Sequence, residues 1–191
     1  MAQWSDASGR ETMARRMSSA DRKSHRRFAA DCFNGTWKLL LKKKRTRDED
    51  LEMIHRAHAS RYHWGVVGDA TTLAIGEWQV SHVYSVLRRP EPALYHGRES
   101  LRICREHGIG DFPLAYAYEA LARASAVAGR GRDARRFLAL GRNAGRRIRE
   151  ADDRKLFLDD LETVPGARSA RRSGSGSSKG KRPARKGTRR S

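Results

Sequence analysis

The chain has few residues of the kinds that build covalent cross-links or membrane spans. It contains two cysteines, Cys32 and Cys104, in 191 residues, and each lies alone within a helical pattern of apolar residues. A disulfide framework is therefore not expected, and both side chains fit reduced thiols that pack in a core. No run of about 18 apolar residues occurs, and the N-terminal segment lacks an apolar signal sequence. We therefore expect a cytoplasmic protein without a membrane span.

Motifs for catalysis and cofactor binding are also missing. The sequence contains no phosphate-binding loop, no Rossmann fingerprint, no HExxH and no paired CxxC. The alternation of β-branched residues that marks strands is missing too, whereas helix formers and small residues dominate. We accordingly expect an all-α protein that is not an enzyme and that binds no cofactor or metal.

The net charge is +19, and most of the excess lies at the two ends of the chain. Residues 166–191 carry ten Lys or Arg and no acid, and residues 1–30 carry seven bases and three acids. The remaining residues carry 24 bases and 19 acids, which is close to balance. We expect an unstructured segment 1–21, a helical domain 22–165 and a disordered Lys/Arg/Ser/Gly-rich tail 166–191.

Apolar residues recur at helical spacing in seven segments. The predicted helices are residues 22–44, 48–64, 71–89, 92–106, 112–128, 132–150 and 152–161. Asn34-Gly35 in the first segment also fits a turn, so one long helix or two short ones remain open. The residues of the second helix expected to point inward are Leu51, Ile54, Ala57, His58 and Tyr62. The short last helix is expected to cover the exposed end of the helical array.

Capping residues and prolines mark the helix boundaries. Thr46 and Glu49 have the spacing of a capping box, and Asp111 is expected to cap the helix whose first turn contains Pro113. Pro90 ends one helix because proline displaces the residue before it from helical geometry, while Pro92 suits the first turn of the next helix.

The helix pair at residues 71–106 presents small side chains on one contact face. Ala93, Gly97 and Ser100 recur at helical spacing in its second helix. Small side chains let two helices approach closely, so the pair is expected to fold back as an antiparallel hairpin. A hairpin of this kind needs neighbours to cover its remaining apolar surface, which favours an array of such units.

A shift of 41 residues superimposes this hairpin on the next one by residue character. The shift pairs Val80 with Leu121 and Ala93 with Ala134, and the residues WKLL at 37–40 match a W-x2-L opening. The pattern resembles the tetratricopeptide repeat over roughly residues 25–162. The resemblance implies a right-handed array of antiparallel helical hairpins, a solenoid whose concave surface is lined by the first helix of each unit.

The same resemblance implies which residues face the concave groove. They are Lys38, Lys42, Arg45, Trp78, Gln79, His82, Tyr116, Glu119 and Arg123. Aromatic and cationic side chains in one groove suit a protein or peptide partner with acidic groups or a C-terminal carboxylate. The match to the carboxylate-clamp subgroup is poor, since Gln79 stands where asparagine is typical. An ordinary solvent-exposed surface is the alternative interpretation.

Two groups of residues invite a chemical interpretation. His55 and His58 share a helix face and His63 follows them, but a metal site would need a further ligand from elsewhere. We favour a partly buried histidine that is hydrogen-bonded across a helix interface. A helix N-terminus and a solvated face, rather than an acid–base pair, explain the acids Asp152, Asp153, Asp159 and Asp160.

The basic tail suggests a second function. Ten cations on a flexible chain bind polyanions through counterion release, without sequence preference. The residues expected to contact RNA or DNA are Arg182, Arg185, Lys186, Arg189 and Arg190, with the run Lys42–Arg47 as a further basic site. A tail that only raises solubility is the alternative.

These patterns favour a non-enzymatic helical-repeat adaptor that binds a protein or peptide partner through its groove, with a tail that attracts polyanions. A protein whose main role is to bind nucleic acid, through the tail and Lys42–Arg47, is the alternative. The partner's identity and the oligomeric state do not follow from the sequence.

Overall fold

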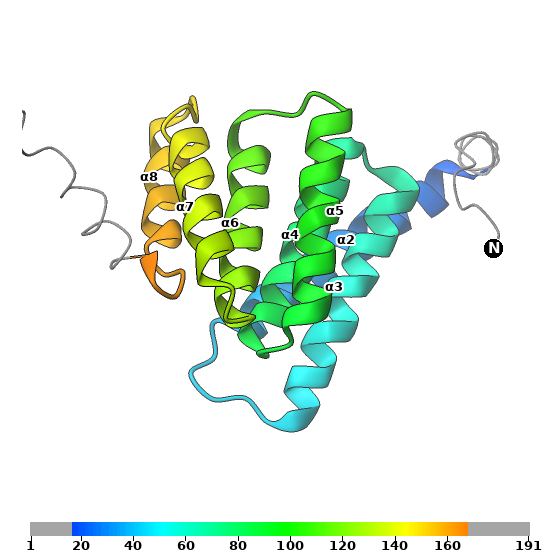
Figure 1. Ribbon diagram of the computed structural model, residues 1–191. Helices are drawn as coiled ribbons and strands as arrows, with labels where there is room; N and C mark the ends of the chain where they lie inside the picture. The colour runs from blue at the N-terminus through cyan, green and yellow to red at the C-terminus, as the bar shows by residue number, and fades with distance from the viewer. Residues whose placement is uncertain (1–16, 168–191) are drawn as a thin grey trace, which may run out of the picture.

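The structure, a computed structural model, describes residues 17–167, which form seven α-helices and no strand. The helices are α2 (Ser19–Leu40), α3 (Arg47–Val67), α4 (Ala70–Val86), α5 (Pro90–Glu106), α6 (Asp111–Val127), α7 (Gly131–Gly145) and α8 (Ala151–Leu161). They pack against their neighbours in chain order, from α2 and α3 at one end to α8 at the other (Figure 1). The all-α prediction is confirmed for these residues. The terminal segments 1–16 and 168–191, both expected to be unstructured, lie outside the described residues.

Several helices begin at a side chain that accepts a hydrogen bond from a free backbone amide. The Ser18 hydroxyl accepts a bond from the amide of Asp21 at 3.1 Å at the start of α2. The predicted capping box of Thr46 and Glu49 is confirmed at the start of α3. Asp69 and Thr72 form a second box at α4. The sequence rule misses it because threonine takes the place of the usual Glu or Gln.

Two helix boundaries resolve or correct the sequence prediction. α2 runs without interruption through Asn34-Gly35, so the single-helix alternative is confirmed, although the helix ends at Leu40 and not at residue 44. α7 ends at Gly145, so the prediction that it continues to residue 150 is wrong. The chain leaves the helix there and buries Ile148, which is only 2% exposed, before α8 begins.

The prediction that Asp111 caps α6 is wrong. Gly110 is the N-cap, and no side chain bonds to the first turn. Asp111 is instead the first helical residue, with a φ of 55°, and its carboxylate accepts a hydrogen bond from the Arg149 amide at 3.2 Å. The carboxylate therefore ties the start of α6 to the segment between α7 and α8.

The buried face of α3 differs from the predicted one. Met53, Ala57 and Ser60 are buried against the neighbouring helices, whereas Leu51 is 39% exposed and Tyr62 is 63% exposed. The prediction was wrong for Leu51 and Tyr62 because the contact face is centred on Ala57, and this rotation turns both of them toward solvent.

The small residues of the central hairpin lie at a close helix contact, as predicted. Ala93 and Ser100 are fully buried, and Gly97 is buried between them. A Cβ atom at Gly97 would lie 3.2 Å from Cδ2 of Leu121 and 3.2 Å from Oγ of Ser81. Because glycine has no side chain, α5 can pack directly against both α4 and α6.

Buried serine hydroxyls connect the helices of two hairpins. Three of them donate to main-chain carbonyl oxygens of the paired helix at 2.7 to 2.9 Å, Ser60 to Ala29, Ser81 to Ala93 and Ser100 to Ala74. Each bond satisfies a hydroxyl in an otherwise apolar contact, where an unpaired polar group would be costly. A bond of this length requires backbones that lie close together, so the serines also fix the separation of the helices.

The period of 41 residues is visible in the helices themselves. α4 and α6 both contain 17 residues and begin 41 residues apart, and α5 and α7 also begin 41 residues apart. The turn inside each hairpin has one residue with positive φ at the matching position, Arg88 at 55° and Gly129 at 71°. The architecture is therefore compatible with a helical-repeat fold.

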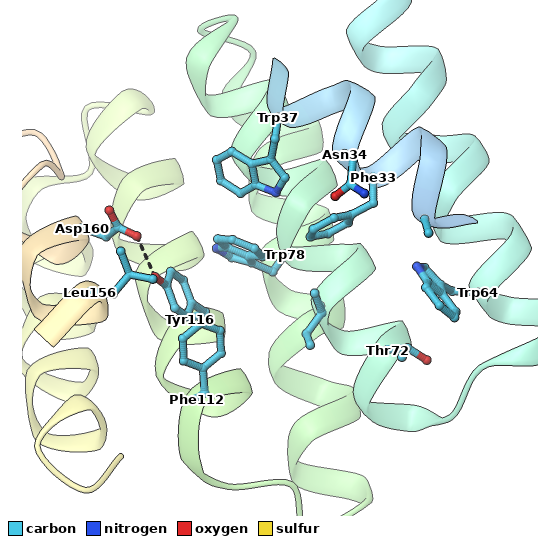
Figure 2. Close-up of a pocket in the computed structure, with 12 residues that line it drawn as sticks. Phe33, Asn34, Trp37, Trp64, Thr72, Trp78, Phe112, Tyr116, Leu156 and Asp160 are labelled. Carbon is cyan, nitrogen blue, oxygen red and sulfur yellow. Dashed lines mark hydrogen bonds between the residues drawn. The ribbon is translucent and has the colours of Figure 1, made fainter. Parts of the chain in front are cut away.

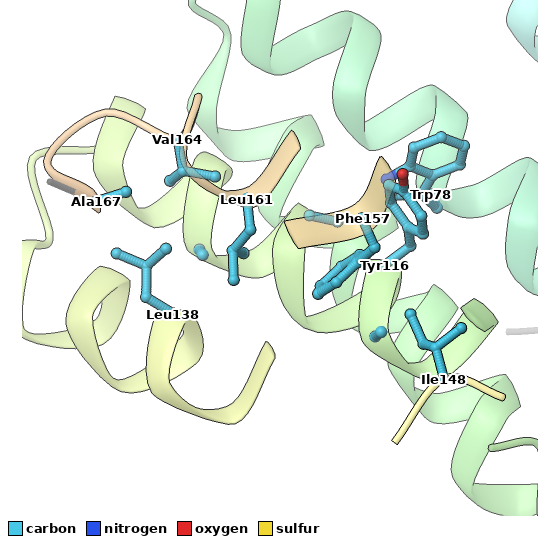
Figure 3. Close-up of a cluster of buried hydrophobic side chains, with 11 residues drawn as sticks. Trp78, Tyr116, Leu138, Ile148, Phe157, Leu161, Val164 and Ala167 are labelled. Atoms are coloured by element: carbon cyan, nitrogen blue, oxygen red, sulfur yellow. The ribbon is translucent and has the colours of Figure 1, made fainter. Parts of the chain in front are cut away.

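The last helix covers the end of the array. Phe157 and Leu161 of α8 are fully buried, and Val164 and Ala167 beyond it are almost fully buried. Figure 3 shows these side chains directed toward Leu138 of α7 and Tyr116 of α6. Residues 166 and 167, which the sequence places in the tail, thus still belong to the folded part.

Gly97→Ala should destabilise the protein by about 1 to 3 kcal/mol, because the added methyl group crowds Leu121 and Ser81 in a packed contact. Urea unfolding measures the loss. The matched control is Gly131→Ala in the first turn of α7, where the residue is exposed and the helix gains propensity. Equal stability of Gly97→Ala and the natural chain would contradict the close contact.

Arg88→Gly should stabilise the protein by about 0.5 to 1 kcal/mol. Positive φ is sterically unfavourable for arginine, whereas glycine adopts it without strain. The strain removed from the folded state should exceed the loss of stability that comes from glycine's greater conformational entropy in the unfolded chain. Thermal unfolding of Arg88→Gly and of Arg89→Gly tests this, because Arg89 has an ordinary φ of −105°. A variant at Arg88 that is no more stable than the one at Arg89 would contradict the prediction.

Candidate functional site

A groove of about 640 Å³ opens on the face of the protein formed by the first helix of each hairpin. α4 and α6 form its floor, and α2 and α8 form its two sides (Figure 2). Its apolar lining consists mainly of Phe33, Trp37, Ile75, Trp78, Phe112, Tyr116 and Leu156. A concave, largely apolar surface of this volume is typical of ligand-binding sites in proteins.

Five aromatic rings form a continuous row in this groove. The centroid separations along the row are 6.4 Å from Phe33 to Trp37, 5.6 Å from Trp37 to Trp78, 4.6 Å from Trp78 to Tyr116 and 4.5 Å from Tyr116 to Phe112. Tilted and edge-to-face contacts at these distances are favourable arrangements of aromatic rings. The row joins three helices, so it holds α2, α4 and α6 together and forms much of the groove lining.

One end of the groove continues into a smaller cavity of about 180 Å³, here called the polar end. The two cavities share Trp37, Trp78, Tyr116 and Asp160. The polar end adds the polar side chains of His82, Glu119, Arg123 and Thr163.

Glu119 is the centre of the hydrogen bonds at the polar end. Its Oε2 accepts a bond from Nε1 of Trp78 at 3.1 Å, and its Oε1 accepts one from Nε of Arg123 at 2.6 Å. Arg123 in turn donates to Oγ1 of Thr163 at 2.7 Å, which links α6 to the segment that follows α8. Glu119 is only 1% exposed, so both bonds are needed to keep a buried carboxylate. The network also fixes the plane of the Trp78 ring.

Asp160 and Tyr116 meet at the boundary between the two cavities. The Tyr116 hydroxyl donates to Oδ2 of Asp160 at 2.6 Å, as the dashed line in Figure 2 shows. Burial, together with this hydrogen bond, raises the pKa of Tyr116 above its ordinary range, so the phenol stays neutral. Asp160 forms no ion pair with any residue in the described range 17–167.

His82 is held in its neutral form. Burial lowers the pKa of His82 to about 4, and the nearby Arg123 adds to this effect, while Glu119 opposes it. Its ring lies 5.6 Å from Trp37 and 6.1 Å from Trp78 between centroids. The Nδ1 atom is buried and has no hydrogen-bond partner within the described part of the chain.

The structure brings together five of the nine residues that the sequence places in the groove. These are Trp78, His82, Tyr116, Glu119 and Arg123. Trp78, Tyr116 and Glu119 are 7% exposed or less, so they form the floor of the site and not an open surface. Gln79 is fully buried behind the floor and donates to the carbonyl oxygen of Phe33 at 3.1 Å.

The remaining three predicted residues lie elsewhere. Lys38 lines a separate hollow between α2 and α3. Lys42 forms an ion pair with Glu49, and Arg45 pairs with Asp50 at 2.7 Å between Nε and Oδ1. Lys38 is outside the groove because α2 turns its Phe33 and Trp37 side to that surface. Lys42 and Arg45 are outside it because α2 ends at Leu40 and both lie in the connection to α3.

Four further residues complete the groove, and little in the sequence predicts their place there. They are Trp37, Phe112, Leu156 and Asp160. Phe112 precedes Tyr116 by four residues, so the two share a helix face, and this spacing is the one signal available for it. Trp37 is recognisable as a motif residue, but its position beside Trp78 depends on how α2 packs. Leu156, which is 52% exposed, and Asp160 come from α8, which has no counterpart in the repeat.

The histidines of α3 are not brought together. His55 is exposed, His58 lies 3.0 Å through Nε2 from the Tyr84 hydroxyl of α4, and His63 lies 2.8 Å through Nδ1 from Nδ1 of His25. The interpretation of His58 as a histidine bonded across a helix interface is confirmed. Within residues 17–167 no group of three or more His, Cys, Asp or Glu side chains has the arrangement of a metal site.

Comparison with protein-family models, with curated proteins and with solved structures finds no match to this chain. The likeness to tetratricopeptide repeats therefore depends on the residue pattern and on the packing of the helices alone. None of the helices between residues 17 and 167 has the length and apolar character needed to cross a membrane.

The neutral His82 predicts a loss of stability in acid. An unfolded chain binds a proton at this residue below about pH 6.5, whereas the folded protein does not until about pH 4. The free energy of unfolding should therefore fall as the pH decreases through this window, by up to about 3 kcal/mol for this one group. His82→Gln should show a smaller fall.

Urea unfolding between pH 7 and pH 4 measures the effect as the difference between the two proteins. Burial also lowers the pKa values of His58 and His63, so these residues contribute to the loss of stability in acid. Their contribution is the same in both proteins and cancels in the difference. His107→Gln is the control because His107 is exposed in the connection between α5 and α6. Identical pH profiles for His82→Gln and the natural chain would contradict the prediction.

Proposed function

We propose that this protein is a non-enzymatic adaptor whose groove binds an apolar segment of a protein or peptide partner. The observation that carries the proposal is the row of five aromatic rings in a groove of about 640 Å³. Aromatic side chains that are already fixed by their neighbours lose little entropy on binding, so they serve well as contact surface.

The polar groups of the site support binding rather than catalysis. Glu119 is engaged by Trp78 and Arg123, and the Tyr116 hydroxyl is engaged by Asp160. These bonds position rings and helices, and the raised pKa of Tyr116 keeps its hydroxyl protonated and weakly nucleophilic. The chemistry of the site is therefore that of a shaped surface with a polar end.

A helical-repeat scaffold agrees with this role. We infer a right-handed solenoid of the tetratricopeptide kind, in which α2, α4 and α6 are the first helices of successive units. Such arrays use the concave surface formed by these helices for extended ligands. The groove lies across all three of them, which suits a peptide that crosses the helices.

The tail supplies a second, weaker affinity in this proposal. Its ten cations attract polyanions such as RNA or DNA, or an acidic partner surface, with the salt dependence of counterion release. The residues Arg182, Arg185, Lys186, Arg189 and Arg190 lie outside the described range. Nucleic-acid binding as the main function is less well supported, because Lys42 and Arg45 are paired with Glu49 and Asp50.

Leu156→Gln tests the proposed groove. Leu156 is 52% exposed on the groove wall, so a glutamine there should leave the fold intact and place a neutral polar group in the path of an apolar ligand. Peptides are selected from a phage-displayed random library on the natural protein, and their affinities are measured by fluorescence polarisation. We expect a loss of roughly tenfold with Leu156→Gln, since an unpaired amide buried against apolar groups costs about 1 to 3 kcal/mol.

Leu41→Gln is the matched control, because Leu41 is 78% exposed just beyond the end of α2 and does not line the groove. Its peptide affinity should equal that of the natural protein. Circular dichroism and thermal unfolding check that both variants fold. Peptides that bind Leu156→Gln and the natural protein equally would show that they do not use the groove.

A further inference from the structure

The polar end of the groove carries one carboxylate that no cation of residues 17–167 balances. Glu119 is paired with Arg123 at 2.6 Å, so these two charges compensate each other. Asp160 has the Tyr116 hydroxyl as a neutral partner on Oδ2 and makes no ion pair with a residue of the described chain. The site therefore has a net charge of −1 from its Asp, Glu and Arg side chains.

This charge is unusual for its surroundings. The whole chain has a net charge of +19, yet the residues that line the large groove include no Lys or Arg. The polar end includes one, Arg123, whose guanidinium is already bound to Glu119 and Thr163. His82 adds no charge at neutral pH, since burial lowers its pKa to about 4. Among the described residues, the lining of the groove and of its polar end thus contains no cation that is not already paired.

Aromatic faces surround the unbalanced carboxylate. Trp37, Trp78 and Tyr116 line both cavities together with Asp160, and their rings are in mutual contact. A cation is attracted to the face of an aromatic ring, most strongly to tryptophan, when it lies within about 6 Å of the ring centre. A carboxylate beside such rings adds a direct ion pair.

We propose that the polar end binds the cationic side chain of a lysine or arginine of the partner peptide, next to the apolar residue that occupies the groove. The proposal rests on the proposed function and specifies its ligand as a basic, apolar peptide. The cation lies over the ring of Trp37, which is more exposed than Trp78, and pairs with Asp160. This reverses the sequence-based expectation of an acidic partner, because the predicted cations Lys38, Lys42 and Arg45 lie outside the groove.

An anionic ligand fits the same site poorly. A phosphate or carboxylate group would meet the charge of Asp160 and would have only Arg123 as a cationic partner, which Glu119 already neutralises. Like charges at short distance are unfavourable, and more so in a partly desolvated cavity. The aromatic row is consequently better explained by a peptide than by stacked nucleic-acid bases.

Asp160→Asn is the decisive variant. An asparagine keeps an oxygen that can accept the Tyr116 hydrogen bond, so the cavity keeps its shape while the charge is removed. The probe is the strongest-binding peptide from the phage-displayed random library, together with a synthetic version in which its lysine or arginine is replaced by glutamine. Asp159→Asn is the control, because Asp159 is the exposed neighbour that pairs with Lys155 on the same helix.

We expect selected peptides to carry Lys or Arg beside an aromatic or aliphatic residue. Asp160→Asn and the glutamine peptide should each weaken binding roughly fivefold to tenfold, which is the size of a partly desolvated cation contact, and Asp159→Asn should have no effect. The glutamine peptide on the natural protein needs no protein variant, so its result stands even if Asp160→Asn unfolds.

Apolar peptides without a preferred cation, or equal binding to the lysine or arginine peptide and its glutamine version, would overturn this inference and leave the proposed groove intact. Enrichment of acidic peptides would overturn it as well. Selection of no peptide whose binding depends on Leu156 would overturn both the inference and the proposed function.

Discussion

The close approach of paired helices is the constraint on which the rest of this structure depends. A Cβ atom at Gly97 would crowd Leu121 and Ser81, and Ser60, Ser81 and Ser100 donate to carbonyl oxygens of the neighbouring helix. Larger side chains would separate the helices and leave these hydroxyls without partners. The small side chains and the serine bonds hold the helix backbones at a fixed distance. Consecutive hairpins can therefore stack in register, so that equivalent positions of α4 and α6 lie side by side.

The site follows from this register. Trp78 of α4 and Glu119 of α6 are 41 residues apart, the period of the hairpins, and they form a direct hydrogen bond of 3.1 Å. Equivalent positions of consecutive hairpins thus have different roles. Trp78 contributes an aromatic ring to the groove, and Glu119 is the buried hydrogen-bond acceptor that holds this ring in place. α2 then contributes Trp37 beside Trp78, and α8 contributes Asp160 beside Tyr116.

Features that depend on local residue spacing could be predicted from the sequence. The positions of residues that depend on packing between distant helices could not. The helices and the small-residue contact follow from patterns within one hairpin or between two of them. The grouping of Trp78, Tyr116 and Glu119 is implied by the resemblance to tetratricopeptide repeats. Lys38 is misplaced because the rotation of α2 depends on its contacts. The position of Asp160 has no sequence signal at all, since α8 stands outside the repeat and meets α6 only in three dimensions.

The two carboxylates of the polar end have different surroundings, which bears on the ligand that we propose for the site. Glu119 is fully enclosed, so the fold itself must supply its partners, which are Trp78 and Arg123. Asp160 is only partly buried, so solvent can reach its carboxylate when no ligand is bound. An apolar ligand that covered Asp160 without a cation would exclude this solvent and leave the charge unpaired, which costs free energy. In the proposed complex, the free energy that discriminates between ligands would therefore arise when a ligand covers Asp160, and it would favour a ligand that brings its own positive charge.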